Sequence, residues 1–205
     1  MLKKVGYHTH KNLQLNSGLL FTELDISAFR DLRDIEKGVN EALISGEKFL
    51  GVTRNGVSFI AQPRYREYYC DGEQFNRVAC RTIIGWDIKL EVVIVEISSE
   101  LLNRVLTSSW IDQQLENVKR IELSSVIMDG SIDNLVWIGD MSDGGLILIE
   151  LRNAVCIGGI RFVSEDNTEN GIATRFTPHI GDYYNPVEPP FSIYFISAGK
   201  ENADE

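Results

Sequence analysis

Apolar and polar residues alternate along much of the chain with the period of two that is typical of β-strands. The clearest example is WDIKLEVVIV, residues 86–95, whose second half is apolar on both faces. Further short runs of the same kind are LLFTEL, LVWIG, LILIEL, AVCIGGIRF, IATRFTPHI and FSIYFI. Clusters of Gly, Asp, Asn and Pro separate the later runs, as in a β-sandwich or barrel. The pattern therefore predicts a mainly β fold.

Two segments follow the helical period instead. AFRDLRDIEKGVNEALISG, residues 28–46, comes directly after Ser27 and carries apolar side chains at helical spacing. SSELLNRVL offers Ser98 or Ser99 as its N-cap and places an apolar stripe on a short helix. We expect this second helix to pack on the sheet, which gives a mainly β protein with a side helix (α+β).

The segment from Ser58 to Val92 predicts an unusually long hairpin around an Asp71-Gly72 turn. Extended chain from Ser58 to Asp71 would span ~40 Å at ~3.3 Å per residue. A compact domain of this size has a radius of gyration of only ~17 Å. We therefore expect a long hairpin arm, residues 58–85, that projects from the body.

Aromatic and charged residues are interleaved along this arm. The residues singled out as a contact surface are Arg64, Tyr65, Arg66, Tyr68, Tyr69, Asp71, Gly72 and Phe75. Aromatic residues and Arg are enriched in interface cores, and a two-stranded ribbon is not stable by itself in water. The arm is therefore predicted to lie against another surface. The alternative is a hairpin folded back over its own sheet.

Two dipeptides predict further turns. Asn55-Gly56 is the strongest short-range signal for a tight turn or hairpin. Arg152-Asn153 lies between two apolar runs that are close enough in sequence to form a second hairpin.

Composition and charge restrict the class of protein. With 205 residues, 43% hydrophobic and 24% charged, the chain fits a single domain over residues 1–205, with a flexible tail at residues 197–205. A net charge of -10 argues against tight nucleic-acid binding, because phosphate binding needs clusters of Lys and Arg. The start lacks the apolar run of a secretory signal, and no segment reaches the ~20 apolar residues of a membrane span. We expect a protein made in the cytoplasm, with no membrane contact.

Motifs for catalysis, metals and phosphates are weak. GVTRNGVS has the glycine spacing of a phosphate loop but no following Lys, and DNTENG begins like a calcium loop but has Thr177 where a Glu ligand is needed. His8 and His10, with His179 as a distant third ligand, are better explained as polar positions than as a metal site. The three cysteines fit neither a disulfide framework nor a zinc site. We expect no enzymatic activity and no cofactor.

The order and spacing of several motifs resemble the major tail proteins, or tail tube proteins, of long-tailed bacteriophages. The likeness runs from about Leu20 to Ile196 in FLGVTRNGVSFIAQPRYREYYCDGE, GWDIKLEVVIVEISSELLNRVL, IGDMSDGGLILIELRNAVCIGG and PVEPPFSIYFI. The family has a glycine-rich turn before GVSF, a long hairpin with DG at its tip, and a W-x-x-x-L-x-x-x-x-x-E-x-[ST] strand before a short helix. The matching residues are Gly56, Ser58, Phe59, Asp71, Gly72, Trp86, Leu90, Glu96 and Ser98. The tip itself is more polar than in the family.

The resemblance implies a β-sandwich or barrel that forms hexameric rings, which stack into a hollow tail tube with a lumen for DNA. It implies a virion structural protein of a phage or phage-tail-like particle, without a catalytic site. Its partners would be other copies of itself, a tail-tip or baseplate initiator, the tape measure protein and sheath proteins, with DNA as non-specific cargo. The hairpin arm and an N-terminal arm, residues 1–18, would contact neighbouring subunits.

The strand WDIKLEV is the candidate for the inner wall of such a tube. Its polar residues Asp87, Lys89 and Glu91 would then face the lumen. A mixed, net acidic lining would let DNA move without adhering, because tight phosphate binding needs basic clusters.

Two other classes of function stay open. A monomeric β-sandwich that binds a ligand or carbohydrate could use Trp110, Trp137 and the Tyr183-Tyr184 pair as a stacking surface. A hydrolase could assemble its site from scattered carboxylates, and the candidates are Asp140, Asp143 and Glu150. Only the tail tube protein needs to form rings or filaments.

Overall fold

The computed structural model of the chain describes residues 14–26, 29, 31–46, 48–68, 81–115, 118–126, 133–161, 171–179 and 189–197. The helices are α2 (Leu32–Ser45) and α3 (Ser99–Val105). The strands are β1 (Gln14–Thr22), β2 (Phe49–Glu67), β3 (Arg81–Ile94), β4 (Ser109–Leu115), β5 (Val118–Leu123), β6 (Asp133–Met141), β7 (Leu146–Cys156), β8 (Ile172–Pro178) and β9 (Phe191–Ile196). Within this part of the chain, no helix is both long and apolar enough to cross a membrane.

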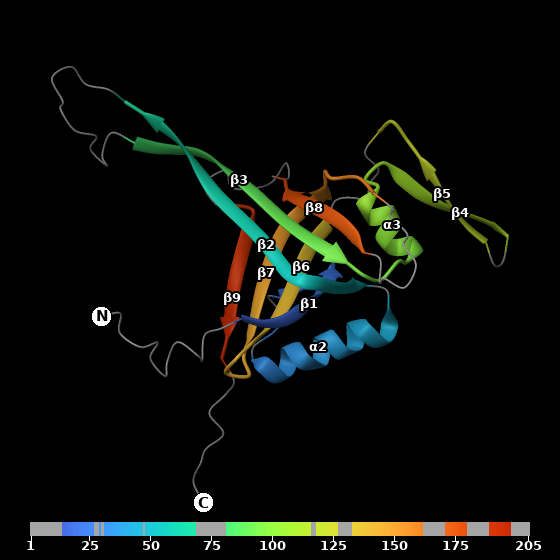
Figure 1. Cartoon of the computed structure of the whole chain (residues 1–205), viewed down its shortest axis with the longest axis horizontal. Coiled ribbons are helices and arrows are strands. Elements are labelled where there is room, and N and C mark those ends of the chain that lie inside the picture. Colours follow the sequence, from blue (N-terminus) through green and yellow to red (C-terminus); the bar gives the residue numbers. More distant parts are fainter. Residues whose placement is uncertain are drawn as a thin grey trace, which may run out of the picture.

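Six strands close into an antiparallel barrel in the order β1-β2-β3-β8-β7-β6, with β6 paired to both β1 and β7 (Figure 1). The first half of β7 also pairs with β9, and its last residues, from Ala154 to Cys156, pair with β8. The expectation of a mainly β fold of the sandwich or barrel type is confirmed at this level.

The strand period places two apolar layers on one wall of the barrel. On β6, Leu135 and Trp137 point into the barrel core, whereas Val136 and Ile138 belong to a second cluster that includes residues of α2. Both faces of β6 are therefore buried, as its nearly continuous apolar sequence requires. Figure 1 shows α2 lying along the outer side of this wall.

Trp137 lies in the barrel core with 1% of its surface exposed. Its indole Nε1 donates a hydrogen bond to Thr53 Oγ1 at 3.2 Å, and Thr53 Oγ1 in turn donates to the carbonyl of Gly18 at 2.9 Å. Gly18 and Gly139 lie so close to the indole that a Cβ on either one would overlap it. The ring therefore depends on two glycines in neighbouring strands.

The helix of residues 28–46 is confirmed but begins later than the apolar pattern. Asp31 is its N-cap, because Asp31 Oδ1 accepts a hydrogen bond from the Asp34 amide at 2.9 Å, and Gly46 ends it at φ 70°. The ring of Phe29 packs against Gly38 so closely that a Cβ there would overlap it, which explains why this helix contains a glycine. For α3, the predicted cap at Ser98 is confirmed, since its side chain accepts from the Leu101 amide at 3.0 Å.

The turn predicted at Asn55-Gly56 is wrong. Both residues have left-handed backbones, with φ of 61° and 75°, but they lie inside β2 as a bulge. Arg54 faces Val93 and Val57 faces Val92, so two residues of β2 are left over opposite β3. GVTRNGVS, which lacks the Lys of a phosphate loop, also lacks the strand-loop-helix context of one, because this segment is part of a continuous strand.

The hairpin predicted at Arg152-Asn153 is also wrong, since β7 runs unbroken through both residues. Asn153 has φ 48° and sits where the pairing between β6 and β7 shifts its register. At both dipeptides a residue has the left-handed backbone that a turn would need, but the chain uses it to bend a strand.

Candidate assembly surface

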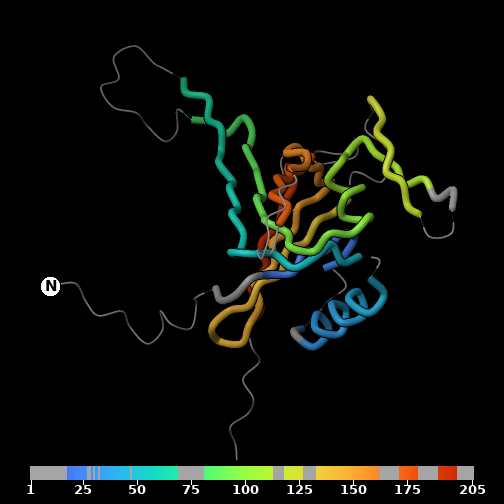
Figure 2. Tube along the Cα trace, turned by 45° about the vertical axis from the view of Figure 1, so that its right-hand side comes forward, coloured from blue at the N-terminus to red at the C-terminus, as the bar shows by residue number. Residues whose placement is uncertain are grey.

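The far ends of β2 and β3 leave the barrel together as a two-stranded ribbon (Figures 1 and 2). We call its described part, residues 64–68 and 81–85, the arm. The preceding part of the predicted arm, from Ser58 to Pro63, belongs to the barrel, because Phe59 and Ala61 pack against the core. Ile84 is an extra residue in β3, since Arg64 faces Gly85 and Tyr65 faces Ile83.

The apolar side chains of the arm are exposed. Tyr65 is 52% and Ile83 48% exposed, and the bulged Ile84 reaches 61%. Sequence analysis singled out the tyrosines but missed Ile83 and Ile84, which the run TIIGW could have indicated. This arrangement leaves an apolar surface that the barrel does not cover.

Charged residues of the arm make contacts within the ribbon. Arg81 Nη2 lies 2.8 Å from Glu67 Oε1, and the guanidinium of Arg66 lies 5.3 Å from the centroid of the Tyr68 ring. These contacts stiffen the ribbon. The predicted contact residues Tyr69, Asp71, Gly72 and Phe75 lie outside the described residues.

Asp87, Lys89 and Glu91 share the outer face of β3, opposite the buried Ile88 and Leu90. Two of them have cationic partners on this same face. Arg64 Nε lies 3.4 Å from Asp87 Oδ1, and Arg175 Nε on β8 donates a hydrogen bond to Glu91 Oε1 at 2.6 Å.

The expected acidic character is not found on this face. Alternation along β2 adds Arg54 and Arg66 to the same side, so the described face carries five cations, namely Arg54, Arg64, Arg66, Lys89 and Arg175, against Asp87 and Glu91. An open groove of about 550 Å³ follows it beside the bulge of β2. The charge of this outer face is mixed and basic on balance, although the chain as a whole is acidic.

The aromatic residues proposed as a stacking surface do not come together. Trp137 is in the barrel core, whereas Trp110 lies on β4 and is 39% exposed. Tyr183 and Tyr184 lie outside the described residues. A carbohydrate surface built on both tryptophans is therefore excluded.

The carboxylates proposed for a hydrolase are also separated. Glu150 is buried and accepts a hydrogen bond from the Tyr194 hydroxyl at 3.0 Å, while Asp143 accepts one from the Gly145 amide at 2.9 Å. Glu150 pairs with Val136, four residues before Asp140 on β6, which is ~13 Å along the strand. These residues do not converge on one site.

No metal site is found within the described parts of the chain, where no three His, Cys, Asp or Glu side chains form a suitable group. His179 lies with Nδ1 3.1 Å from the Thr177 carbonyl oxygen, and Cys156 is a buried thiol. The other candidate ligands, His8 and His10, are outside the described residues, as are Cys70 and Cys80.

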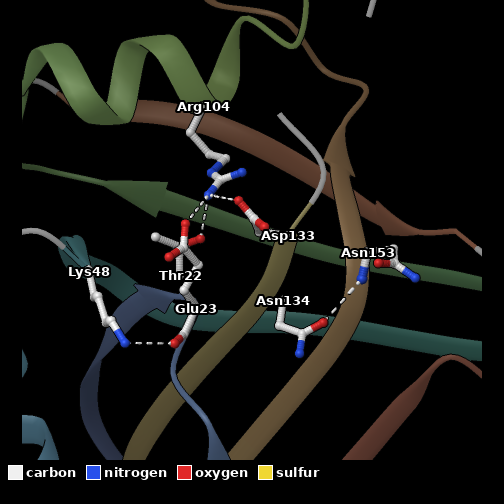
Figure 3. A network of polar contacts seen from close by, with 7 residues as sticks. All are labelled: Thr22, Glu23, Lys48, Arg104, Asp133, Asn134 and Asn153. Atoms are coloured by element: carbon white, nitrogen blue, oxygen red, sulfur yellow. Dashed lines mark hydrogen bonds and ion pairs between the residues drawn. The ribbon is translucent and has the colours of Figure 1, made fainter. Parts of the chain in front are cut away.

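One polar network ties α3 to the barrel (Figure 3). The buried Arg104 donates hydrogen bonds from Nη2 to Thr22 Oγ1 at 2.6 Å and to Asp133 Oδ2 at 2.5 Å, and it lies 3.7 Å from Glu23 Oε1. Lys48 Nζ donates to the Glu23 carbonyl at 3.2 Å. Arg104 pairs with the carboxylates of Glu23 and Asp133, so we assign the network a structural role.

Comparison with known proteins does not assign the chain to a family. No family model matches it, and no curated protein matches it significantly.

Proposed function

We propose that this protein is a structural, self-assembling subunit of the tail tube of a long-tailed phage or of a phage-tail-like particle. Copies would form hexameric rings that stack around a lumen for DNA. Its site of action would be the virion tail, after synthesis in the host cytoplasm.

The observation that carries the proposal is the arm. A two-stranded ribbon gains little stability by itself, and this one exposes Tyr65, Ile83 and Ile84 beyond the reach of the barrel. Contiguous apolar surface on a projecting element is typical of a protein interface. The order of motifs resembles that of tail tube proteins, which assemble with copies of themselves, so we expect the partner of the arm to be another copy of the chain.

Charge is compatible with a channel for DNA. The outer face of β3 carries ion pairs, Asp87 with Arg64 and Glu91 with Arg175, that occupy two of its cations with protein carboxylates. An overall charge of -10 adds long-range repulsion of phosphate. If this face lines a lumen, both features favour transit and counteract the excess of cations on the face, which favours retention.

The test is negative-stain electron microscopy of the purified protein over a concentration series, with and without a short preassembled tail tip as initiator. We expect rings or hollow tubes of uniform width. An Ile84→Lys variant should lose them, because a charge in the apolar surface of the arm must be desolvated on contact.

Ile44→Lys is the matched control, since Ile44 is 87% exposed on α2, outside the arm. The variant should assemble like the wild type. Tubes that form equally well with Ile84→Lys would remove the arm from the contact. Monomers under every seeded condition would contradict the proposed function.

A further inference from the structure

The outer edge of β9 is an unusual surface for a protein that stays monomeric. Within the described residues, β9 pairs only with β7, and its other edge has no strand partner there. Its sequence, FSIYFI, contains no charge and no Pro. Exposed edges normally carry Lys, Pro or a bulge that prevents pairing with another chain, and β9 has neither of the first two.

Two large apolar side chains mark one face of this edge strand. Ile193 is 41% and Phe195 69% exposed, and they point to the same side because they are two residues apart. The neighbouring Phe191 packs against Phe59 and Trp86 at the base of the arm, with ring centroids 5.3 and 6.2 Å away. The exposed pair therefore continues an apolar surface that begins in the core.

A second ribbon lacks a sheet to join. Strands β4 and β5 form a two-stranded sheet separate from the barrel, and Figures 1 and 2 show it projecting away from the barrel beside α3. Leu123 is 67% and Val118 52% exposed on β5, more than Trp110 on β4. Ile121 and Leu123 are again two residues apart, which matches the spacing of Ile193 and Phe195.

Strand β9 and the β4–β5 ribbon lie on opposite sides of the molecule in Figure 1. Strands β9 and β5 have equal length, six residues each. We propose that β9 of one copy pairs with β5 of a second copy, so that β7 and β9 continue into the β5–β4 ribbon of the neighbour. Ile193 and Phe195 then pack beside the neighbour's Ile121 and Leu123.

Two physical arguments favour β5 of a second copy as the partner of β9. Three or more strands with an apolar face are needed for a stable sheet, so the ribbon gains what it lacks alone. Because the two surfaces differ, the contact is heterologous and passes from copy to copy until a ring closes or a filament grows. The inference rests on the self-association in the proposed function, and it names a contact that does not involve the arm.

Two blocked variants test the contact directly. Phe195→Lys disables the β9 surface and leaves β5 intact, whereas Leu123→Lys disables β5 and leaves β9 intact. Each should self-associate at least about tenfold more weakly than the wild type in sedimentation velocity, which is a loss of about 1.4 kcal/mol. Circular dichroism checks that both remain folded.

Mixing the two variants is the decisive step. In the mixture, the Leu123→Lys variant supplies an intact β9 and the Phe195→Lys variant supplies an intact β5. The two variants should therefore form a discrete heterodimer that neither forms alone. Ile44→Lys should assemble like the wild type, because its exposed side chain lies on α2.

The outcomes separate this contact from the tube itself. Tubes that persist in both blocked variants would overturn the β9–β5 contact and leave the proposed function standing. Small complexes that depend on Phe195 and Leu123 but never form tubes would support the contact and count against the tube. A mixture without heterodimer, or a wild-type protein without any self-association, would overturn the contact.

Discussion

The same two strands, β2 and β3, build a part of the buried barrel core and an exposed ribbon. Inside the barrel, Ile88 and Leu90 are 4% and 0% exposed, whereas Ile83 in the arm is 48% exposed. The antiparallel ladder continues through both regions. Pairing thus extends as far as the two strands do, but burial ends where no third element covers the ribbon.

The largest expected effect of this difference is on amide hydrogen exchange. Ladder amides around Leu90 and Val92 should exchange only by global unfolding, which costs roughly 5–15 kcal/mol in a domain of this kind, while those around Arg66 and Thr82 should open locally. Protection should therefore fall by at least about three orders of magnitude along one strand. Equal protection in both regions would show that the arm is held by the barrel, and slower exchange in the arm on assembly would show what covers it.

Substitution in the barrel core should have the next largest effect. Trp137→Ala removes a side chain that is 1% exposed and its hydrogen bond to Thr53, so it should lower the free energy of unfolding by roughly 3–5 kcal/mol. Tyr65→Ala in the arm should change it by about 0.5 kcal/mol or less. Urea denaturation measures both, and similar losses from the two variants would refute the contrast between barrel and arm.

A buried ion pair of Arg104 on α3 and an exposed ion pair on β5 extend the comparison. Arg104→Met removes charged hydrogen bonds to Thr22 and Asp133 and should cost about 2–3 kcal/mol. Arg120→Met removes an exposed pair with Glu122 on the second ribbon and should cost about 0.5 kcal/mol or less. Thermal unfolding of both variants tests this order, and a larger loss for the exposed pair would reverse the interpretation.

The smallest expected effect is pH-dependent. Glu100 on α3 accepts a hydrogen bond from Lys119 of β5 at 2.6 Å, and this bond, aided by the backbone amide of Glu100, lowers the pKa of its carboxyl below 4.5. A lowered folded-state pKa stabilises the protein above pH 4.5, and the contribution is lost as the pH falls through the folded value.

Glu100→Gln should therefore reduce stability at neutral pH by less than about 1 kcal/mol, because the pair is half exposed and screened by solvent. The difference from the wild type should vanish well below pH 4.5, as urea titrations at several pH values would measure. A difference that grew on acidification would assign the effect of Glu100 to another cause.

Local patterns were enough to predict the elements with strong periods. The alternation around Ile88 and Leu90 predicted β3, and Ser98 predicted the start of α3, because period and capping depend on neighbours in sequence. The length of the extended run from Ser58 to Asp71 likewise predicted the arm, although its first part, from Ser58 to Pro63, belongs to the barrel. The ribbon of β4 and β5 was missed, since its side chains alternate only over a few residues.

Other features were decided by partners distant in the chain. Asn55-Gly56 and Asn153 carry the left-handed backbones that a turn would need, but β3 and β6 continue beside them and convert both into bends within strands. The sequence determined by itself which residues alternate and that Asn55-Gly56 readily takes a positive φ, because these depend on local sterics. Only the tertiary structure decided which edges pair, since that depends on where the barrel closes, and among the described residues no strand covers the arm or the outer edge of β9.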